Sequence, residues 1–447
     1  LMDIIEVDVV VIGGGTSGIF AALYLALKGF KVALIERAGK IGGALVNSLV
    51  YPTAGFHTPN GKLITSPLVN SFLEEAIKNK LTLGHIRDPL NFAFSVTPIH
   101  PTAYKLLFHK LLNLKNFIFL PFSKIENISY KNQKVNHIHL KSVFKKYKVK
   151  SKLFVDSSGT LITSYFLPMD YTFDIYNLQA LSLIFKVSNI DFQSILNDVK
   201  KNPQEFYSKT NPDLMISQNF LSISGYYQIA KQFLNNKDLL LTRDRFLFFS
   251  DIDKNSVVVN TTRLFLKELD KELNINDIES IENQSYKFLL KQVFYIHKVM
   301  KDNIEGFRNS YISEIADFVG IRQFRNIKGL YTLELNDIKL GKFLEDTISI
   351  GTWPIDIHIS NSIIENKISE NGYGIPFRSC INNYKNIVFI GKNISADKYA
   401  FSSLRIQATL MIMGENIGRI LETCLTKKIN PVDLDYKLIQ KSVKFNY

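Results

Sequence analysis

The sequence predicts an α/β protein of the Rossmann type, in which both ends of the chain contribute to one sheet and an α+β domain is inserted between them. A strand and a glycine-rich turn stand near the N-terminus, and apolar strands at residues 154–159 and 386–391 also end in small residues. The 447 residues are too many for one simple core, so we expect two connected domains.

The first element is the β-branched run at residues 7–12, which is typical of a fully buried parallel strand. A turn with the spacing GxGxxG follows, and apolar residues then recur at helical spacing as far as Gly29. A second strand at residues 31–35 ends at Glu36. This order of strand, glycine turn, helix, strand and acid predicts a dinucleotide site.

Each residue type in this segment suits a dinucleotide. Gly13 permits a tight turn, Gly15 lets the backbone approach a diphosphate, and Gly18 lets the helix pack closely on the strand. The helix N-terminus offers free N–H groups to phosphate oxygens, and an acid can accept hydrogen bonds from a ribose. The residues that we expect at the nucleotide are Gly13, Gly15, Thr16, Ser17, Gly18, Glu36 and Arg37.

Three later features favour FAD over NAD. Two glycines follow Glu36 closely, the strand at residues 154–156 ends in a small-residue turn, and the strand at residues 386–390 leads to a helix expected from about Ser402. A nucleotide site made by both chain ends is typical of FAD proteins. The sequence has no second GxGxxG, so we expect no separate domain for NAD(P)H. The further residues expected at FAD are Gly42, Gly43, Ser158, Gly159, Gly391, Ser403 and Leu404.

The composition is that of an ordinary globular protein, apart from a net charge of +13. The lysines are dispersed along the chain, which indicates that the positive charge reflects a general bias in amino-acid composition. A basic patch that binds nucleic acid or anionic lipid is the alternative. Lysines alternate along residues 146–152, and we expect a solvated edge strand there. Cys380 and Cys424 form no CxxC pair, which indicates a reducing compartment. Without a signal peptide or membrane-spanning run, we expect a cytoplasmic protein.

Five motifs stand in the last third of the chain: GIRQFRNIKG at residues 320–329, WPIDIH at 353–358, YGIPFR at 373–378, GKNISA at 391–396 and SSLR at 402–405. Together they resemble a bacterial family of FAD-dependent oxidoreductases in the glutathione-reductase superfamily, near the fumarate reductase and succinate dehydrogenase flavoproteins. The resemblance covers both chain ends well and residues 160–300 only loosely. It implies redox chemistry on FAD without indicating a substrate.

The chain departs from that family at four positions. Gln323 stands where the family usually has Glu, and Lys392 replaces an Arg at the strand end. Lys398 and Phe401 occupy positions where histidines are common. Flavin binding depends on glycines and backbone groups and should survive, but any catalytic role of those histidines or that glutamate does not transfer.

The candidates for chemistry are three arginines and one histidine. We expect Arg405, one turn into the C-terminal helix, to support negative charge on the reduced flavin or to bind an acidic substrate. Arg322 and Arg378 suit a carboxylate clamp, although structural ion pairs are the alternative. His358 has the pKa range for proton transfer, or serves only the structure. His137 and His139 lack further ligands, so we expect no metal site.

These features predict an FAD-binding domain in residues 1–160 and 351–447, with a cap or substrate domain in residues 161–350. We expect hydride transfer between the flavin and a small organic substrate, with carboxylate-bearing compounds among the candidates. The alternatives are a flavin monooxygenase or halogenase, an RNA-binding flavoprotein that uses the positive charge, and a flavin-binding protein without turnover. The substrate, the electron partner and the number of subunits do not follow from the sequence.

Overall fold

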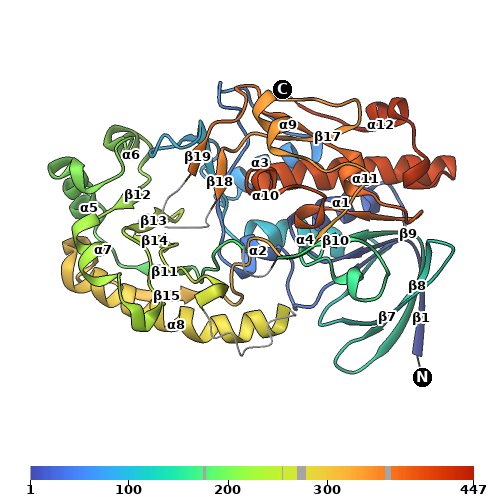
Figure 1. Cartoon of the computed structure of the whole chain (residues 1–447), viewed down its shortest axis with the longest axis horizontal. Coiled ribbons are helices and arrows are strands. Elements are labelled where there is room, and N and C mark those ends of the chain that lie inside the picture. Colours follow the sequence, from blue (N-terminus) through green and yellow to red (C-terminus); the bar gives the residue numbers. More distant parts are fainter. Residues whose placement is uncertain (1, 175–177, 254, 269–277, 358–363, 447) are drawn as a thin grey trace.

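The computed structural model describes residues 2–174, 178–253, 255–268, 278–357 and 364–446 (Figure 1). Its main sheet has seven strands in the order β6-β2-β1-β9-β8-β7, with β21 also paired to β9. Strands β1, β2, β6, β9 and β21 pair in parallel. The bounds are β1 (Met2–Ile12), β2 (Val32–Ile35), β6 (Phe117–Leu120), β7 (Lys124–Lys131), β8 (Lys134–Lys141), β9 (Lys146–Asp156) and β21 (Ile387–Phe389).

The sheet is therefore assembled from both ends of the chain, as the sequence predicts. Strand β21 pairs with the last three residues of β9, and β8 pairs with its first half. The prediction of an edge strand at residues 146–152 is wrong, because β9 lies between β1 and β8. Lysine alternation marks a solvent-facing side of the sheet here, not its edge.

Two apolar cores cover the two faces of the main sheet. Val9 and Val11 belong to the larger core, which also contains helices α1 (Thr16–Leu27) and α11 (Gln407–Lys427). Val10 and Ile12 belong to a second core with residues of the β7–β8 hairpin. Strand side chains point alternately to opposite faces, so the continuous apolar run in β1 follows from burial on both faces.

Helices α1 and α11 pack closely because α11 carries two glycines one turn apart. A Cβ atom on Gly414 would lie 2.2 Å from the carbonyl oxygen of Ser17, and one on Gly418 would lie 3.0 Å from the Tyr24 side chain. The two helix backbones can approach only without those side chains.

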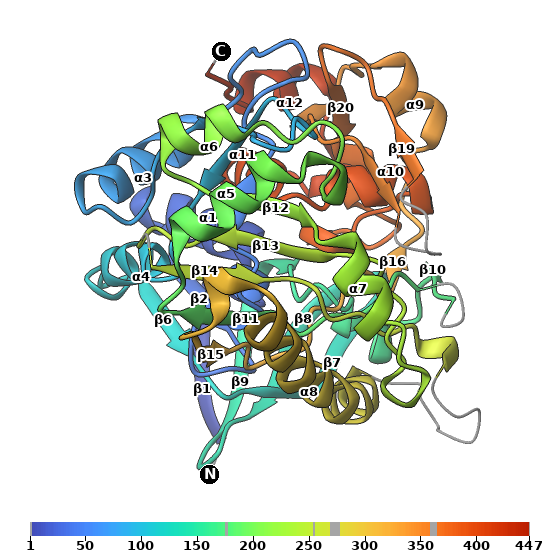
Figure 2. The same cartoon turned by 90° about the vertical axis from the view of Figure 1, so that its left-hand side faces the viewer.

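The inserted cap contains a five-stranded antiparallel sheet in the order β12-β13-β14-β11-β15. Figures 1 and 2 show α8 (Ile278–Asn303) running along this sheet, on the far side of the cap from α10 and α11. The insertion therefore combines strands with a long helix, as expected of an α+β domain. The strands are β11 (Phe185–Ser188), β12 (Ser222–Gly225), β13 (Phe246–Ser250), β14 (Ser256–Val259) and β15 (Tyr311–Ile315).

Smaller elements connect these two parts. The remaining helices are α2 (Gly43–Asn47), α3 (Pro67–Lys78), α4 (Ala103–Leu112), α5 (Phe192–Lys201), α6 (Pro212–Gln218), α7 (Tyr227–Phe233), α9 (Leu335–Leu340), α10 (Lys398–Leu404) and α12 (Tyr436–Ser442). Short sheets are formed by β3 (Pro52–Ala54), β4 (Ile86–Arg87) and β5 (Ser95–Pro98), by β10 (Tyr171–Thr172) and β16 (Asn326–Ile327), by β17 (Thr347–Gly351) and β20 (Tyr373–Pro376), and by β18 (Ile355–Ile357) and β19 (Ile364–Asn366).

The prediction of one helix starting near Ser402 is wrong. Ser402 lies inside the short helix α10, and the long helix α11 begins at Gln407. The two are separated because Ile406 has an extended backbone, with φ −80° and ψ 143°. Arg405 is consequently the C-terminal cap of α10 and does not lie one turn into a helix.

Candidate functional site

The three glycines of the GxGxxG turn differ in what surrounds them. Gly13 has φ +95°, and a Cβ there would lie 2.7 Å from the backbone of Ser158. A Cβ on Gly18 would lie 2.1 Å from the Gly13 carbonyl oxygen. At Gly15, by contrast, the nearest atom of the chain would be 3.9 Å away. Protein packing requires the first two glycines, whereas Gly15 borders space that a ligand could occupy.

The N-termini of α1 and α11 meet at this turn. The Thr16 hydroxyl donates a hydrogen bond to the side-chain oxygen of Gln407, and neither helix has an acidic residue in its first turn. Ser17 is 3% exposed, and its hydroxyl has no hydrogen-bond partner among the described residues. A Cβ on Gly391, just after β21, would lie 3.3 Å from that hydroxyl. Two positive helix ends and an unused donor therefore meet where the strand from the C-terminal end arrives, which suits a diphosphate.

The glycine pair that follows β2 also lies on the turn. The N–H of Gly42 donates to the Gly14 carbonyl oxygen at 2.7 Å, and Gly42 has φ +111°. A Cβ on Gly43 would come within 2.8 Å of Gly15 Cα. These two residues therefore form a second layer of backbone against the turn.

The acid and the arginine after β2 point to different partners. Glu36 is buried and accepts backbone hydrogen bonds from Gly14 (2.7 Å) and Ala38 (2.9 Å). Burial raises the pKa of Glu36, and these hydrogen bonds oppose the rise. Arg37 instead forms a two-pronged ion pair with Glu282 of α8, at 2.5 and 3.0 Å. Arg37 thus connects the end of β2 to the cap.

The strand ends of β9 and β21 are tied together beside the glycine turn. Asp156 accepts hydrogen bonds from the Ser158 hydroxyl (2.6 Å) and the Asn393 amide (2.8 Å). Gly159 has φ +70°, and a Cβ there would lie 3.0 Å from the Lys392 side chain. Ser158, Gly159 and Gly391 are therefore neighbours of the turn.

Lys392 reaches from the end of β21 toward the cap. Its ammonium group donates to the Ile321 carbonyl oxygen at 2.6 Å. Burial, and then the positive charges of Arg405 and Arg37, lower the pKa of Lys392 to about 8. A negative group beside Lys392 would relieve this repulsion.

Two residues expected at FAD have side chains that serve the structure. The Ser403 hydroxyl donates to the Trp353 carbonyl oxygen at 2.5 Å and accepts from the Tyr373 hydroxyl at 2.7 Å. Leu404 is fully buried in the larger core. The contact with the turn is made beyond them, by the Gln407 side chain at the start of α11.

The three candidate arginines divide into two groups. Arg378 forms a two-pronged pair with the buried Asp346, at 3.0 and 3.1 Å. Arg405 Nη2 lies 3.5 Å from Asp356 Oδ2, and Arg322 donates to the Ala180 carbonyl oxygen. Burial, and then Arg405 and Arg243, lower the pKa of Arg322 to about 9. Arg322 and Arg405 thus share one site, and Arg378 serves another; His358 lies outside the described residues.

Sequence reasoning missed Arg243 and the partnership of Asp356 with Arg405. Arg243 is 8% exposed, and its Nε has no hydrogen-bond partner among the described residues. Burial, and then Arg263 and Arg245, lower the pKa of Arg243 to about 9. The signal in the sequence is TRDRF at residues 242–246, where two arginines flank an acid just before an apolar strand.

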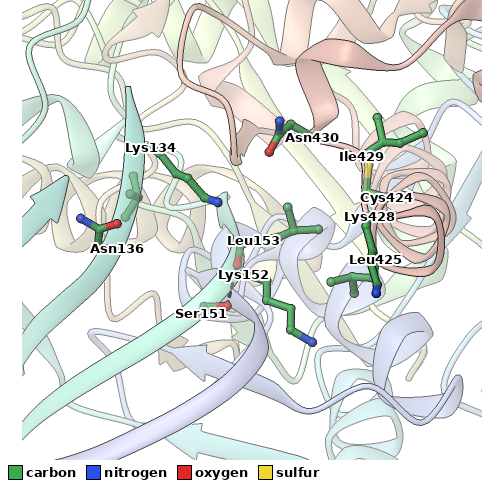
Figure 3. Close-up of a pocket in the computed structure, with 11 residues that line it drawn as sticks. Lys134, Asn136, Ser151, Lys152, Leu153, Cys424, Leu425, Lys428, Ile429 and Asn430 are labelled. Atoms are coloured by element: carbon green, nitrogen blue, oxygen red, sulfur yellow. Dashed lines mark hydrogen bonds between the residues drawn. The ribbon is translucent and has the colours of Figure 1, made fainter. Parts of the chain in front are cut away.

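A surface hollow of about 550 Å³ lies away from this site, between β8, β9 and the end of α11 (Figure 3). Lys134, Lys152 and Lys428 line it, together with backbone and apolar groups. Lys152 pairs with Asp8 at 2.8 Å, and Lys150 pairs with Glu6 at the same distance. The acids of β1 thus offset part of the positive charge on β9.

The fold and the glycine turn define a dinucleotide-binding protein of the Rossmann type. A family model described as FAD dependent oxidoreductase matches residues 8–443, and the chain belongs to this family. Its cofactor is FAD. The open space at Gly15, the unpaired Ser17 hydroxyl and the excess of buried cations fit that group.

Curated relatives match over short segments. Thiamine thiazole synthase from Methanococcus maripaludis strain C6 is 60% identical over 42 residues, which are 9% of this chain and 16% of that protein. Ferredoxin–NADP reductase from Lactococcus lactis subsp. cremoris is 34% identical over 83 residues, 18% of this chain and 25% of that protein. The chain thus spans a quarter or less of the length of these relatives.

Solved structures align over nearly the whole chain at low identity. A p-nitrophenol 4-monooxygenase from Pseudomonas putida DLL-E4 has a TM-score of 0.49 and 10% identity, covering 99% of this chain and 84% of that one. A geranylgeranyl bacteriochlorophyll reductase-like protein from Thermoplasma acidophilum has a TM-score of 0.47 and 13% identity, covering 98% and 82%. In the part of the chain that the structure describes, no helix has the length and apolar character needed to cross a membrane.

Proposed function

We propose that the protein transfers a hydride between FAD and a small organic substrate. Residues 1–160 and 351–447 would hold FAD, and residues 161–350 would cover the substrate. When bound, FAD supplies the two-electron chemistry, and the protein supplies binding, orientation and electrostatics. The motifs after residue 320, which resemble oxidoreductases of the glutathione-reductase superfamily, support hydride transfer over oxygen insertion.

The observation that carries this proposal is the meeting of the α1 and α11 N-termini beneath the cap. The cap residues Phe220 and Phe249 share an apolar cluster with Trp353 and Ile406, directly beside the helix break. This contact joins the cap to the helix break before α11, and it supports a cap that covers the substrate. Exclusion of water there strengthens electrostatic interactions with a reacting group.

The chain's own charges have distinct roles in this proposal. The N-terminus of α11 and the guanidinium of Arg405 would stabilise negative charge at the nearby end of the cofactor. Lys392 would face the negative groups of FAD from the end of β21. His358 stays our predicted proton donor or acceptor.

The test is anaerobic mixing of the FAD-loaded protein with panels of small alcohols, amines and carboxylic acids, followed by the flavin absorbance. Bleaching by a substrate without oxygen supports the proposal. Reduction by NAD(P)H alone, followed by an oxygen-dependent transient absorbance band, would favour a monooxygenase or halogenase. Copurifying RNA that nuclease removes would favour the RNA-binding alternative, and a flavin that no compound reduces would favour binding without turnover.

A further inference from the structure

Arg243 precedes β13 and lies beyond the end of the cap sheet at which β13 begins. The pairing of β13 with β14 continues past the end of β14, where the N–H of Asn260 donates to the carbonyl oxygen of Leu247 in β13 at 2.8 Å. Further along the same segment, Leu264 exchanges two backbone hydrogen bonds with Leu181, at 2.8 and 3.0 Å. Arg243 lies four residues before Leu247, so it leaves the sheet at the end where Leu264 and Leu181 meet.

Arg322 leaves the sheet at the same end. Gly320 pairs with Ser182, and its N–H donates to the Ser182 carbonyl oxygen at 2.7 Å. Two residues further on, Arg322 donates to the Ala180 carbonyl oxygen. Continuing these antiparallel registers places Arg243 and Arg322 at the same end of the cap sheet, with the segments of Leu264 and Leu181 between them.

A third guanidinium comes from the FAD-binding part of the chain. Arg405 stands at the break between α10 and α11 and contacts Asp356 of β18. Its neighbour Ile406 shares an apolar cluster with Phe249 of the cap. Asp356 acts electrostatically on Arg243, Arg322 and Arg405 alike. The three arginines therefore surround one region between the cap sheet and the helix break.

This region carries more positive than negative charge among the described residues. Asp356 is one carboxylate for three guanidinium groups, and Asp244, the other acid that acts on Arg243, is held by Arg245 at 2.8 and 3.1 Å. The Nε atoms of Arg243 and Arg405 are buried and have no hydrogen-bond partner in the described structure. A buried N–H group without a hydrogen-bond partner is costly, so a ligand that brings negative charge and accepts from these groups would be bound favourably.

We propose that Arg243, Arg322 and Arg405 bind a carboxylate group of the substrate, with Arg243 as the contact supplied by the cap. The planar guanidinium presents parallel N–H groups that match two carboxylate oxygens. The diphosphate of FAD does not explain Arg243. The charges that act most strongly on Lys392, beside the glycine turn, are those of Arg405, Arg37, Glu282 and Arg322, and Arg243 is not among them. This inference rests on the proposed hydride transfer and names its substrate class.

The test measures binding of acetate, pyruvate, succinate and benzoate to the FAD-loaded protein, through changes in flavin absorbance and in thermal stability. Acetamide, pyruvamide, succinamide and benzamide serve as neutral counterparts. We expect at least one acid, and not its amide, to give a saturable change. Arg243→Met should weaken that binding about 10- to 100-fold, the loss of one charge-assisted contact.

Two further variants make this result specific. Arg243→Lys keeps the positive charge but loses the two parallel N–H groups of the guanidinium. We therefore expect an intermediate affinity for the acids and a normal FAD content. Arg308→Met removes an exposed arginine paired with Glu305 and should bind the acids as the natural protein does. Equal binding of acid and amide, unchanged acid affinity in Arg243→Met, loss of FAD from both Arg243 variants, or no binding by any acid would each overturn the inference.

The two proposals can fail separately. If carboxylate binding depends on Arg243 but no substrate bleaches the flavin, the carboxylate site is supported and the proposed hydride transfer is contradicted. If a neutral substrate bleaches the flavin equally fast in the natural protein and in Arg243→Met, hydride transfer is supported and the carboxylate site is contradicted.

Discussion

The hydroxyl of Thr16 donates to the side-chain oxygen of Gln407, and this contact joins the first residues of two helices that are 391 positions apart in the sequence. Gly414 and Gly418 allow the same two helices to pack closely further along. The helix ends are thereby fixed in place before any ligand binds. A preorganised pair of positive helix ends is what an anionic cofactor requires.

Gly15→Ala should lose FAD while keeping its fold. The backbone at Gly15 has φ −72°, which alanine adopts readily, and no atom of the chain lies within 3.9 Å of the new methyl group. We expect a stability loss below about 1 kcal/mol, from the weaker helix cap, and a fall in FAD affinity of at least about tenfold. Thermal unfolding without FAD and titration with FAD measure the two effects. Full FAD affinity in this variant would contradict a cofactor at Gly15.

Gly18→Ala is the matched comparison, because its methyl group must collide with the Gly13 carbonyl oxygen at 2.1 Å. This variant should be destabilised by about 1–3 kcal/mol or more even without FAD. Wild-type stability in Gly18→Ala would show that the turn is not packed as described.

FAD affinity should weaken as the pH rises above 8. Lys392 in the FAD-free protein has a pKa lowered to about 8, so it is charged below that pH and loses its proton above it. A negative ligand favours the charged form, so the dissociation constant of FAD should rise by up to about tenfold per pH unit above this value. The readout is FAD titration across this range for the natural protein and for Lys392→Met. An equally steep rise in Lys392→Met would assign the effect to another group.

The same lysine affects the stability of the FAD-free protein with the opposite sign. The folded chain lowers the pKa of Lys392 below its ordinary value of 10.5, so the unfolded chain binds more protons between pH 8 and 10.5. The contribution of Lys392 to the free energy of unfolding should therefore increase with pH across this window. Chemical unfolding of the natural protein and of Lys392→Met, compared at both ends of the window, measures the difference.

Arg378→Met should reduce stability and leave the chemistry of the folded protein unchanged. It removes both side-chain contacts to Asp346, a carboxylate that is fully buried. The uncompensated acid should cost about 2–3 kcal/mol, moderated by its remaining hydrogen bond from the Arg378 N–H. Urea unfolding and the initial rate of flavin reduction test the two parts. If Arg378→Met unfolds like the natural protein but no longer supports flavin reduction, Arg378 has a role in the active site.

The Arg37–Glu282 ion pair should contribute modestly to the attachment of the cap. The Arg37 side chain is 48% exposed, so solvent screens the pair, and a coupling of about 0.5–1 kcal/mol is expected. A double-mutant cycle with Arg37→Met and Glu282→Gln measures it through thermal unfolding. If both single variants lose FAD affinity in equal measure, Arg37 acts through the cap; loss in Arg37→Met alone would indicate a direct contact with FAD.

The sequence predicts the fold well where local pattern and tertiary environment agree. The continuous apolar run in β1 reports burial on both faces, and the prediction of an α/β fold with an inserted cap is confirmed. FAD as the cofactor is also confirmed. The position of β9 inside the sheet was not readable, because alternating lysines mark solvent exposure of one face and carry no information about neighbouring strands.

The arginine site was only partly readable from the sequence. Motif resemblance indicates Arg322, Arg378 and Arg405 together, but it does not report ion-pair partners, and Asp346 holds Arg378. Arg243 belongs to a region with little resemblance to the family, and its place at the same end of the cap sheet as Arg322 depends on long-range pairing of cap segments. The break between α10 and α11 at Ile406 could not be predicted, because no glycine or proline stands there in the sequence.

The most direct test of the central claim is the visible absorbance spectrum of the purified protein, followed by acid release and chromatography of its cofactor. The account predicts a yellow protein that releases FAD, with one FAD per chain after incubation with excess cofactor. A colourless protein that takes up no added FAD would contradict it, because the turn at Gly15 and the paired helix ends would then have no ligand.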